Sequence, residues 1–224
     1  MWQYQKRLQY PVNIKNTNPK LAQYIVSQYG GPNGEIAASL RYLSQRYSMP
    51  NEVTKSLLTD IGTEELAHME IVGAIVRQLA KNATSEEIEN SPFGQYFMNH
   101  GRGVYPADST GVPFDATAFS VSADPIADMV ENLAAEQKAR AVYDNILRVS
   151  DDPDVNDVIK FLRQREIVHF QRFGEAMLPD LNGFRGKILA VIRMNWRRIL
   201  YVLYYFKNIL DEGIVVKKTM IMRW

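Results

Sequence analysis

The chain has 224 residues, of which 46% are hydrophobic, and its formal net charge is +1. A chain of this length and composition can bury a full core as one domain, and a nearly neutral charge balance gives no electrostatic basis for binding nucleic acid. The absence of cysteine excludes disulfides, thiolate metal ligands and thiol nucleophiles.

The N-terminal region shows no targeting or membrane-spanning pattern. Residues 1–16 are polar and aromatic, with no apolar core and no small-residue cleavage site, so we expect no signal peptide. The longest apolar stretch, 199–206, is far shorter than the ~20 residues needed to span a bilayer. These features predict synthesis in the cytosol and no membrane partner.

The first part of the chain predicts a short helix and two further helices. The short helix covers Pro19–Tyr29 and ends at two glycines, and the second helical pattern follows Pro32 and runs to about Tyr47. Asn51 then caps a long helix that runs to about Lys81. Its inward stripe is spaced by threes and fours and consists of Leu58, Ile61, Glu65, His68, Val72, Ile75 and Leu79.

A long segment without periodicity separates these helices from two more. Gly, Pro, Ser and Asp are frequent from 82 to about 122, and the segment is long enough to connect opposite ends of a bundle. Asp124 opens a third long helix that ends near Val149, and a turn at 150–153 leads to a fourth that ends near Met177. This order predicts an all-α, ferritin-like four-helix bundle with one long crossover between helices 2 and 3.

The C-terminal region differs in composition from the rest of the chain. Residues 187–224 contain eight basic residues and two acidic ones among Ile, Val, Tyr and Trp. We therefore expect a bundle domain over 1–178 and a basic, aromatic tail over 179–224, to which the sequence assigns no role.

One pattern of metal-ligand residue types occurs twice. In each copy a glutamate is followed 30 positions later by a second glutamate, and three positions later by a histidine. The copies are Glu35, Glu65 and His68, and Glu136, Glu166 and His169. In helical bundles, one Glu from each of two helices and a Glu-x-x-His from each of the other two hold two metal ions.

The surroundings of these residues favour a metal site. Glu65 and His68 share one helix face, which is otherwise aliphatic, and an unpaired carboxylate there would cost several kcal/mol or take up a proton. A divalent ion removes that cost. The alternative for the leading glutamates is a salt bridge to a neighbouring arginine, Arg41 or Arg140, which their matching registers disfavour.

A tyrosine follows each leading glutamate by seven positions, at Tyr42 and Tyr143. Each tyrosine has two possible roles. It is either a core aromatic residue whose hydroxyl forms a hydrogen bond with a nearby group, or a hydrogen-bond donor that orients a ligand carboxylate or a bound water. Carboxylate and imidazole ligands without thiolate suit Mn or Fe, and also Zn. His100 lies in the crossover, where we expect a loop histidine with an ordinary hydrogen bond.

Four local sequences resemble the manganese (non-haem) catalases: GGPNGE at 30–35, DIGTEELAH at 60–68, NLAAE at 132–136 and REIVH at 165–169. The short chain and the opening Met1-Trp2-x-Tyr4-x-Lys6 resemble the CotJC-type spore-coat members of that family. The resemblance covers about residues 1–178 and does not extend to the tail.

This resemblance implies two manganese ions per subunit, with iron as the alternative metal. Glu65 would bridge the ions. The implied ligands are Glu35, Glu65, His68, Glu136 and His169. The resemblance places Glu166 outside the ligand set as a proton acceptor, whereas the repeat alone would make it a ligand. The expected catalytic residues are therefore Glu166 and Tyr42.

The implied reaction is the dismutation of hydrogen peroxide to water and oxygen. The family resemblance also implies a homo-oligomer, a hexamer, with the 82–122 segment in subunit contacts, and a location in the spore coat with other coat proteins as partners. Two alternatives remain open: a di-iron ferritin-like oxidase, and a structural coat component with weak or no catalase activity.

Overall fold

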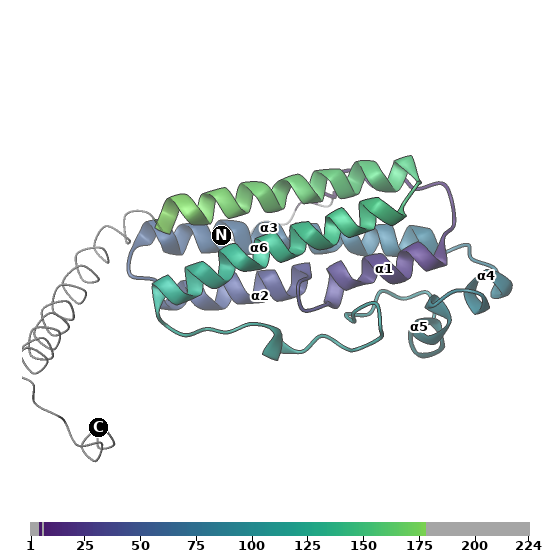
Figure 1. Ribbon diagram of the computed structural model, residues 1–224, viewed down its shortest axis with the longest axis horizontal. Helices are drawn as coiled ribbons and strands as arrows, with labels where there is room; N and C mark the ends of the chain where they lie inside the picture. Colours follow the sequence, from purple (N-terminus) through teal and green to yellow (C-terminus); the bar gives the residue numbers. More distant parts are fainter. Residues whose placement is uncertain (1–4, 6, 178–224) are drawn as a thin grey trace, which may run out of the picture. The chain divides into compact units, whose positions relative to one another are not determined.

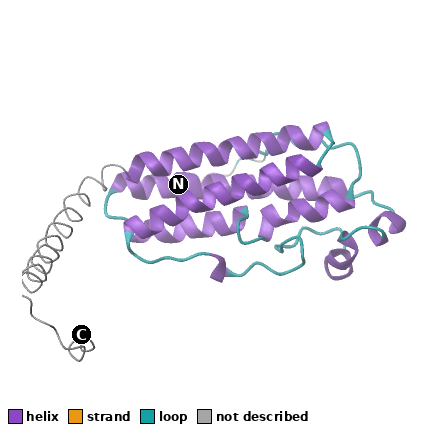
Figure 2. Cartoon of the chain, in the orientation of Figure 1, coloured by secondary structure: helices purple, strands orange, loops and turns teal. Residues whose placement is uncertain are grey.

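The computed structural model describes residue 5 and residues 7–177, and the regular structure of this part is helical (Figures 1 and 2). The elements are α1 (Pro19–Gly30), α2 (Glu35–Gln45), η1 (Arg46–Ser48), α3 (Glu52–Ala80), α4 (Ser85–Glu89), α5 (Phe93–His100), η2 (Ala116–Ala118) and α6 (Pro125–Val149), followed by a helix over 153–177. The predicted all-α bundle is confirmed. The predicted tail, 179–224, lies outside the described residues, and the domain division stays a prediction.

One side of the bundle is made by two helices instead of one. α1 and α2 lie end to end, and both pack against α3 (Figure 1). The chain needs glycine between them because Gly30 and Gly34 approach other backbone too closely for a side chain. A Cβ at Gly30 would lie 2.3 Å from the backbone of Ala107, and one at Gly34 would lie 2.8 Å from the Gln28 carbonyl oxygen. The break makes Glu35 the first residue of α2.

The long helices begin at the capping residues that the sequence predicts. The Asn51 side chain accepts a hydrogen bond from the Thr54 N–H at 2.9 Å, and Asp124 accepts from the first turn of α6. Asp152 accepts from the Asp154 N–H at 2.8 Å at the start of the helix over 153–177. Each cap satisfies backbone donors that have no partner inside the helix.

The crossover between α3 and α6 contains more regular structure than the sequence indicates. It holds α4, α5 and η2, and it runs along α1 and α2. Gln23 and Ser27 of α1 hydrogen-bond to the backbone of Ser109, and Gln45 of α2 donates to the carbonyl of Ser120 at 3.2 Å. The crossover thus follows the divided side of the bundle from end to end (Figure 2).

The buried apolar residues form two clusters. The larger, which we call the α1-end cluster, is centred on Ile25 of α1, Ile75 and Leu79 of α3, Ile146 of α6 and Ile159. The smaller, the α2-end cluster, consists of Tyr42, Met49, Leu58, Ile61, Met129 and Phe173. Along α3, Glu65 and His68 lie between the two clusters. None of the described helices is long and apolar enough to cross a membrane.

Candidate metal centre

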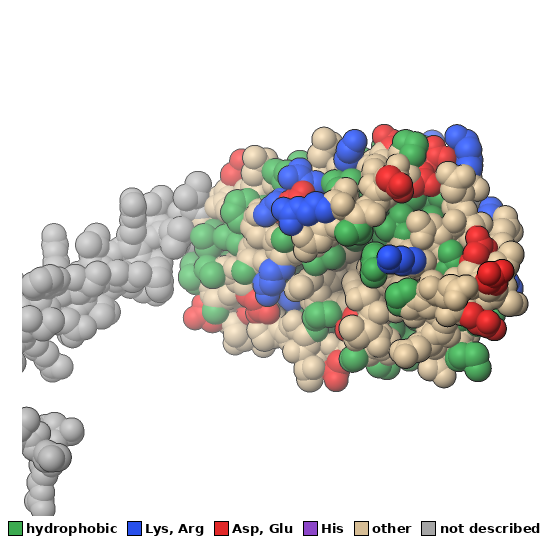
Figure 3. Space-filling model, turned by 45° about the vertical axis from the view of Figure 1, so that its right-hand side comes forward, with side chains coloured by type: hydrophobic (Ala, Val, Ile, Leu, Met, Phe, Trp, Pro, Cys, Tyr) green, Lys and Arg blue, Asp and Glu red, His purple; other side chains and the backbone are tan. Residues whose placement is uncertain are grey.

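The six residues of the sequence repeat come from four sides of the bundle. Glu35 lies on α2, Glu136 on α6, Glu65 and His68 on α3, and Glu166 and His169 on the helix over 153–177. Each is 2% exposed or less. On the face shown in Figure 3 acidic and basic side chains are interspersed and no histidine is visible, in keeping with this burial.

Glu65 lies between the two imidazole rings. Its Oε2 is 2.8 Å from His68 Nδ1, and its Oε1 is 2.8 Å from His169 Nδ1. The rings are stacked, with centroids 5.5 Å apart and planes 21° apart. One carboxylate therefore presents an oxygen to each ring, as a carboxylate shared by two adjacent metal ions would.

The two leading glutamates complete a nearly symmetric arrangement. Glu35 Oε2 lies 3.7 Å from His68 Nδ1, and Glu136 Oε2 lies 3.6 Å from His169 Nδ1. Each Nδ1 thus faces one leading glutamate and one oxygen of Glu65. The alternative that the leading glutamates pair with neighbouring arginines is wrong.

Those arginines have other partners. Arg41 pairs with Glu131, with 3.7 Å between Nε and Oε1, and donates to the Ala118 carbonyl. Arg140 pairs with Asp144 and Gln137. The carboxylates of the centre are consequently left without a cation from Arg41 or Arg140.

The two tyrosines contact the glutamates crosswise. Tyr42 donates its hydroxyl hydrogen to Glu136 Oε1, and Tyr143 donates to Glu35 Oε1. Each tyrosine therefore holds the glutamate of the other copy of the repeat. Burial and the nearby carboxylates raise the pKa of both phenols well above its ordinary value, so both remain donors.

Glu166 faces the same cluster. Atoms of Glu65, His68, Glu166 and His169 that could bind a metal lie within 4.8 Å of one another. Glu166 also lines a cavity of about 10 Å³, together with Tyr42, Ala135, Ala139 and the turn between α1 and α2. This volume is close to the smallest that holds one water molecule.

Burial of so many carboxylates changes their protonation. Burial, reinforced by the charge of Glu65, raises the pKa of Glu35 to about 8, and burial with the neighbouring carboxylates raises the pKa of Glu166 well above its usual range. Burial would also raise the pKa of Glu65, but the charges of His169 and His68 bring it below its usual range. At His169 burial would lower the pKa, but the charge of Glu65 and the contacts with Glu136 and Glu64 outweigh it and raise the pKa to about 12.

The donor atoms fit a pair of metal ions. In this cluster of described residues, Glu136 Oε2 and Glu166 Oε1 are buried without a hydrogen-bond partner. Buried polar atoms without partners are costly, and coordination removes the cost. Oxygen and imidazole nitrogen donors suit Mn and Fe.

Sequence reasoning missed one residue of this region, Glu64. Its oxygens face the far nitrogens of both rings, at 3.6 Å from His68 Nε2 and 3.1 Å from His169 Nε2, and it pairs with Arg165. A signal was present, because Glu64 and Arg165 are 101 positions apart, which is the offset between the two copies of the repeat.

His100 lies away from this centre. It is the last residue of α5, not a loop residue, and its ring stacks on Tyr105 with centroids 3.9 Å apart. Its ring also contacts Tyr96, and its backbone carbonyl accepts a hydrogen bond from the Gly103 N–H at 3.0 Å.

The bundle with a long crossover and a buried cluster of carboxylates and imidazoles defines a ferritin-like protein with a candidate two-metal centre. The chain matches the family described as manganese containing catalase over residues 1–194, past the predicted boundary at 178. It belongs to the manganese catalase family.

Relatives in sequence and structure agree with this membership. The chain is 51% identical over 177 residues to protein CotJC of Bacillus subtilis (strain 168), covering 79% of this chain and 93% of that protein. It is 35% identical over 180 residues to a probable manganese catalase of Clostridium acetobutylicum, covering 80% of each. The solved structure of KatB, a manganese catalase from Anabaena, aligns with a TM-score of 0.75 and 32% identity, covering 82% of this chain and 81% of that one.

Proposed function

We propose that this protein is a dimanganese catalase, which converts two molecules of hydrogen peroxide to two of water and one of oxygen. The observation that carries the proposal is the position of Glu65 between two imidazoles, each of which also faces a leading glutamate. Membership of the manganese catalase family favours manganese over iron.

The ligand assignment follows the two halves of the centre. Glu35 and His68 would hold one ion, Glu136 and His169 would hold the other, and Glu65 would bridge them. When bound, the metal pair supplies two-electron redox chemistry and Lewis acidity. Tyr42 and Tyr143 hold the outer oxygens of Glu136 and Glu35, which would leave the inner oxygens of these glutamates available to hold the ions.

Glu166 would carry protons between the oxygens of the substrate. Its Oε1 has no hydrogen-bond partner, and it lines the small cavity next to the cluster. Burial and the neighbouring carboxylates raise the pKa of this carboxyl well above its usual range, which makes its carboxylate form a stronger proton acceptor. A buried carboxylate within reach of the substrate can accept a proton from one peroxide oxygen and return it to another as water forms. Tyr42 lines the same cavity and would help to position the substrate there.

The assembly and location are also proposals. Similarity to protein CotJC supports a role in the spore coat, with other coat proteins as partners. Family membership supports a homo-oligomer, which we propose to be a hexamer with the crossover in subunit contacts. Sedimentation of the purified protein would measure the assembly, and a monomer would contradict this proposal.

Metal content and peroxide-driven oxygen release, measured on the same purified sample, test the function. We expect about two manganese ions per chain and rapid release of oxygen. Two iron ions with uptake of oxygen would instead indicate an oxidase. Bound metal without turnover would indicate a structural coat component, which the similarity to CotJC makes the second candidate.

Replacement of Glu166 by Gln tests the proton carrier. We expect kcat/KM for peroxide to fall by about 10²–10⁴-fold while manganese content stays at the native level. Glu175→Gln is the matched control, because Glu175 is an exposed glutamate on the same helix. Full turnover in Glu166→Gln would show that this carboxyl carries no proton in the reaction.

A further inference from the structure

The far sides of both imidazole rings point to one carboxylate. His169 Nε2 is 3.1 Å from Glu64 Oε2, and His68 Nε2 is 3.6 Å from Glu64 Oε1. Since the Nδ1 atoms face Glu65, each ring lies between two consecutive glutamates of α3. Glu65 is on the side of the proposed metal ions, and Glu64 is on the opposite side.

Glu64 is itself held in one orientation. Arg165 donates from Nε to Oε1 at 2.8 Å and from Nη2 to Oε2 at 3.1 Å, so the guanidinium binds both oxygens. Gln9 donates to Oε1 at 2.8 Å. Paired donors of this kind fix the plane of a carboxylate as well as its position.

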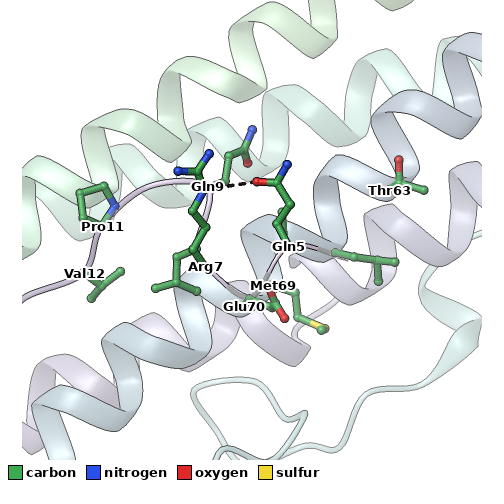
Figure 4. Close-up of a pocket in the computed structure, with 11 residues that line it drawn as sticks. Gln5, Arg7, Gln9, Pro11, Val12, Thr63, Met69 and Glu70 are labelled. Atoms are coloured by element: carbon green, nitrogen blue, oxygen red, sulfur yellow. Dashed lines mark hydrogen bonds between the residues drawn. The ribbon is translucent and has the colours of Figure 1, made fainter. Parts of the chain in front are cut away.

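The N-terminal segment is part of this support. Figure 4 shows Gln9 on this segment, with Pro11 and Val12 following it, as the chain passes over α3. Tyr10, the next residue, stacks on Phe161 with centroids 4.4 Å apart and donates to Asp157 at 2.8 Å. These contacts fix the segment to the helix that carries His169.

We propose that Glu64 is a positioning residue for both metal-binding histidines. A carboxylate accepts hydrogen bonds and does not donate them, so the hydrogen bond at 3.1 Å stabilises the His169 tautomer with hydrogen on Nε2. At 3.6 Å from His68 Nε2, its negative charge favours hydrogen on that nitrogen without a direct hydrogen bond. That tautomer leaves the Nδ1 lone pair of each ring free for a metal ion. Because one carboxylate serves both rings, its loss would weaken both halves of the centre. The inference rests on the metal centre of the proposed function.

A salt bridge that only joins two helices is the competing explanation. The chain contains a matched pair of that kind: Asp144 of α6 accepts a hydrogen bond from Arg163 of the helix over 153–177. The contacts of Asp144 are with arginines, whereas Glu64 also contacts both rings. Asp144→Asn is therefore the control for loss of an interhelical carboxylate.

The first test is the manganese affinity of the Glu64→Gln variant, measured by competition with a chelator on the emptied and refilled protein. A glutamine is uncharged and has one accepting oxygen, so it loses the charge that faces both rings and keeps at most the hydrogen bond to His169. We expect affinity to fall about 10–100-fold. Asp144→Asn should leave affinity unchanged. Native affinity in Glu64→Gln would overturn the proposal, and so would an equal loss in Asp144→Asn.

A second measurement reports the rings directly. In the cobalt-loaded protein, imidazole N–H protons next to the metal give strongly shifted proton resonances that disappear in D₂O. The chain has only three histidines, and His100 lies outside the centre, so the native protein should give two such resonances. We expect at least one to be lost in Glu64→Gln. Two unchanged resonances would refute the positioning role.

Arg165→Gln covers the case in which Glu64→Gln does not fold. This variant retains the Glu64 carboxylate but lacks the guanidinium that orients it. We therefore expect a smaller loss of manganese affinity than in Glu64→Gln. An unchanged affinity would overturn the proposal. These readouts are independent of turnover. A native protein that binds manganese but releases no oxygen would contradict the proposed function and leave the role of Glu64 intact.

Discussion

The α1-end cluster and the metal centre are built from neighbouring turns of the same helices but bury opposite kinds of side chain. On α3, Ile75 and Leu79 are packed among aliphatic residues, whereas Glu65 and His68 are equally buried among charges. Aliphatic burial stabilises the fold directly, while buried charges contribute little unless each is paired. The difference indicates that the apolar end supplies stability, and we propose that the centre supplies function.

Replacement of Glu166 by Leu should have the largest effect on function with no loss of stability. We expect peroxide turnover to fall by about 10²–10⁴-fold because the proton carrier is lost. The metal-free protein should unfold at the same or a higher denaturant concentration, because Glu166 is buried beside Glu136 and Glu65 and its Oε1 has no partner. A large loss of stability would contradict the division between the two regions.

Replacement of Leu79 by Ala addresses the other region. Leu79 is fully buried in the α1-end cluster, so the cavity should lower the free energy of unfolding by about 2–5 kcal/mol. Turnover per bound manganese should not change. Val149→Ala provides the control, because Val149 is 61% exposed and its truncation leaves no cavity. Equal effects of the two substitutions in urea denaturation would refute the prediction.

The pH dependence of stability should arise from the centre. Folding raises the pKa of Glu35 to about 8, that of His169 to about 12, and those of Glu166 and His68 well above their ordinary values. Between pH 5 and 8 the folded metal-free protein therefore holds more protons than the unfolded chain. Its stability should fall as pH rises, by at most about 1.4 kcal/mol per pH unit for each extra proton.

Metal should suppress this dependence, because metal ions replace the protons. Chemical denaturation at several pH values, with and without bound manganese, measures both curves. A metal-free protein that becomes more stable from pH 5 to 8 would contradict the sign of the predicted shifts.

The tyrosines should have the smallest effects. Tyr143→Phe removes the donor to Glu35, and Tyr42→Phe removes the donor to Glu136. We expect each to weaken manganese binding by about tenfold. The two tyrosines make equivalent contacts, each with the leading glutamate of the other copy of the repeat, so the two variants should lose similar amounts of manganese affinity. Competition with a chelator measures both affinities. A silent Tyr143→Phe beside a damaging Tyr42→Phe would instead assign Tyr42 a role beyond support of its glutamate.

The local parts of this protein can be predicted from its sequence. The helix starts at Asn51 and Asp124, the aliphatic stripe of α3, and the shared faces of Glu65 with His68 and of Glu166 with His169 all follow from the helical repeat and from capping, which act over a few residues. Because the same spacing occurs twice, the sequence predicts that six residues far apart in the chain form one centre. The structure buries all six and brings them together. Their roles as ligands and proton carrier stay predictions.

The way in which these parts meet is visible in the folded bundle and not in the sequence. The tertiary structure joined α1 and α2 along one side of the bundle, formed α4 and α5 in the crossover, directed Tyr42 to Glu136 and Tyr143 to Glu35, and placed Glu64 behind both rings with Arg165. These contacts depend on how far one helix is shifted and rotated against another. Packing along the whole bundle sets that relation, and no local spacing encodes it.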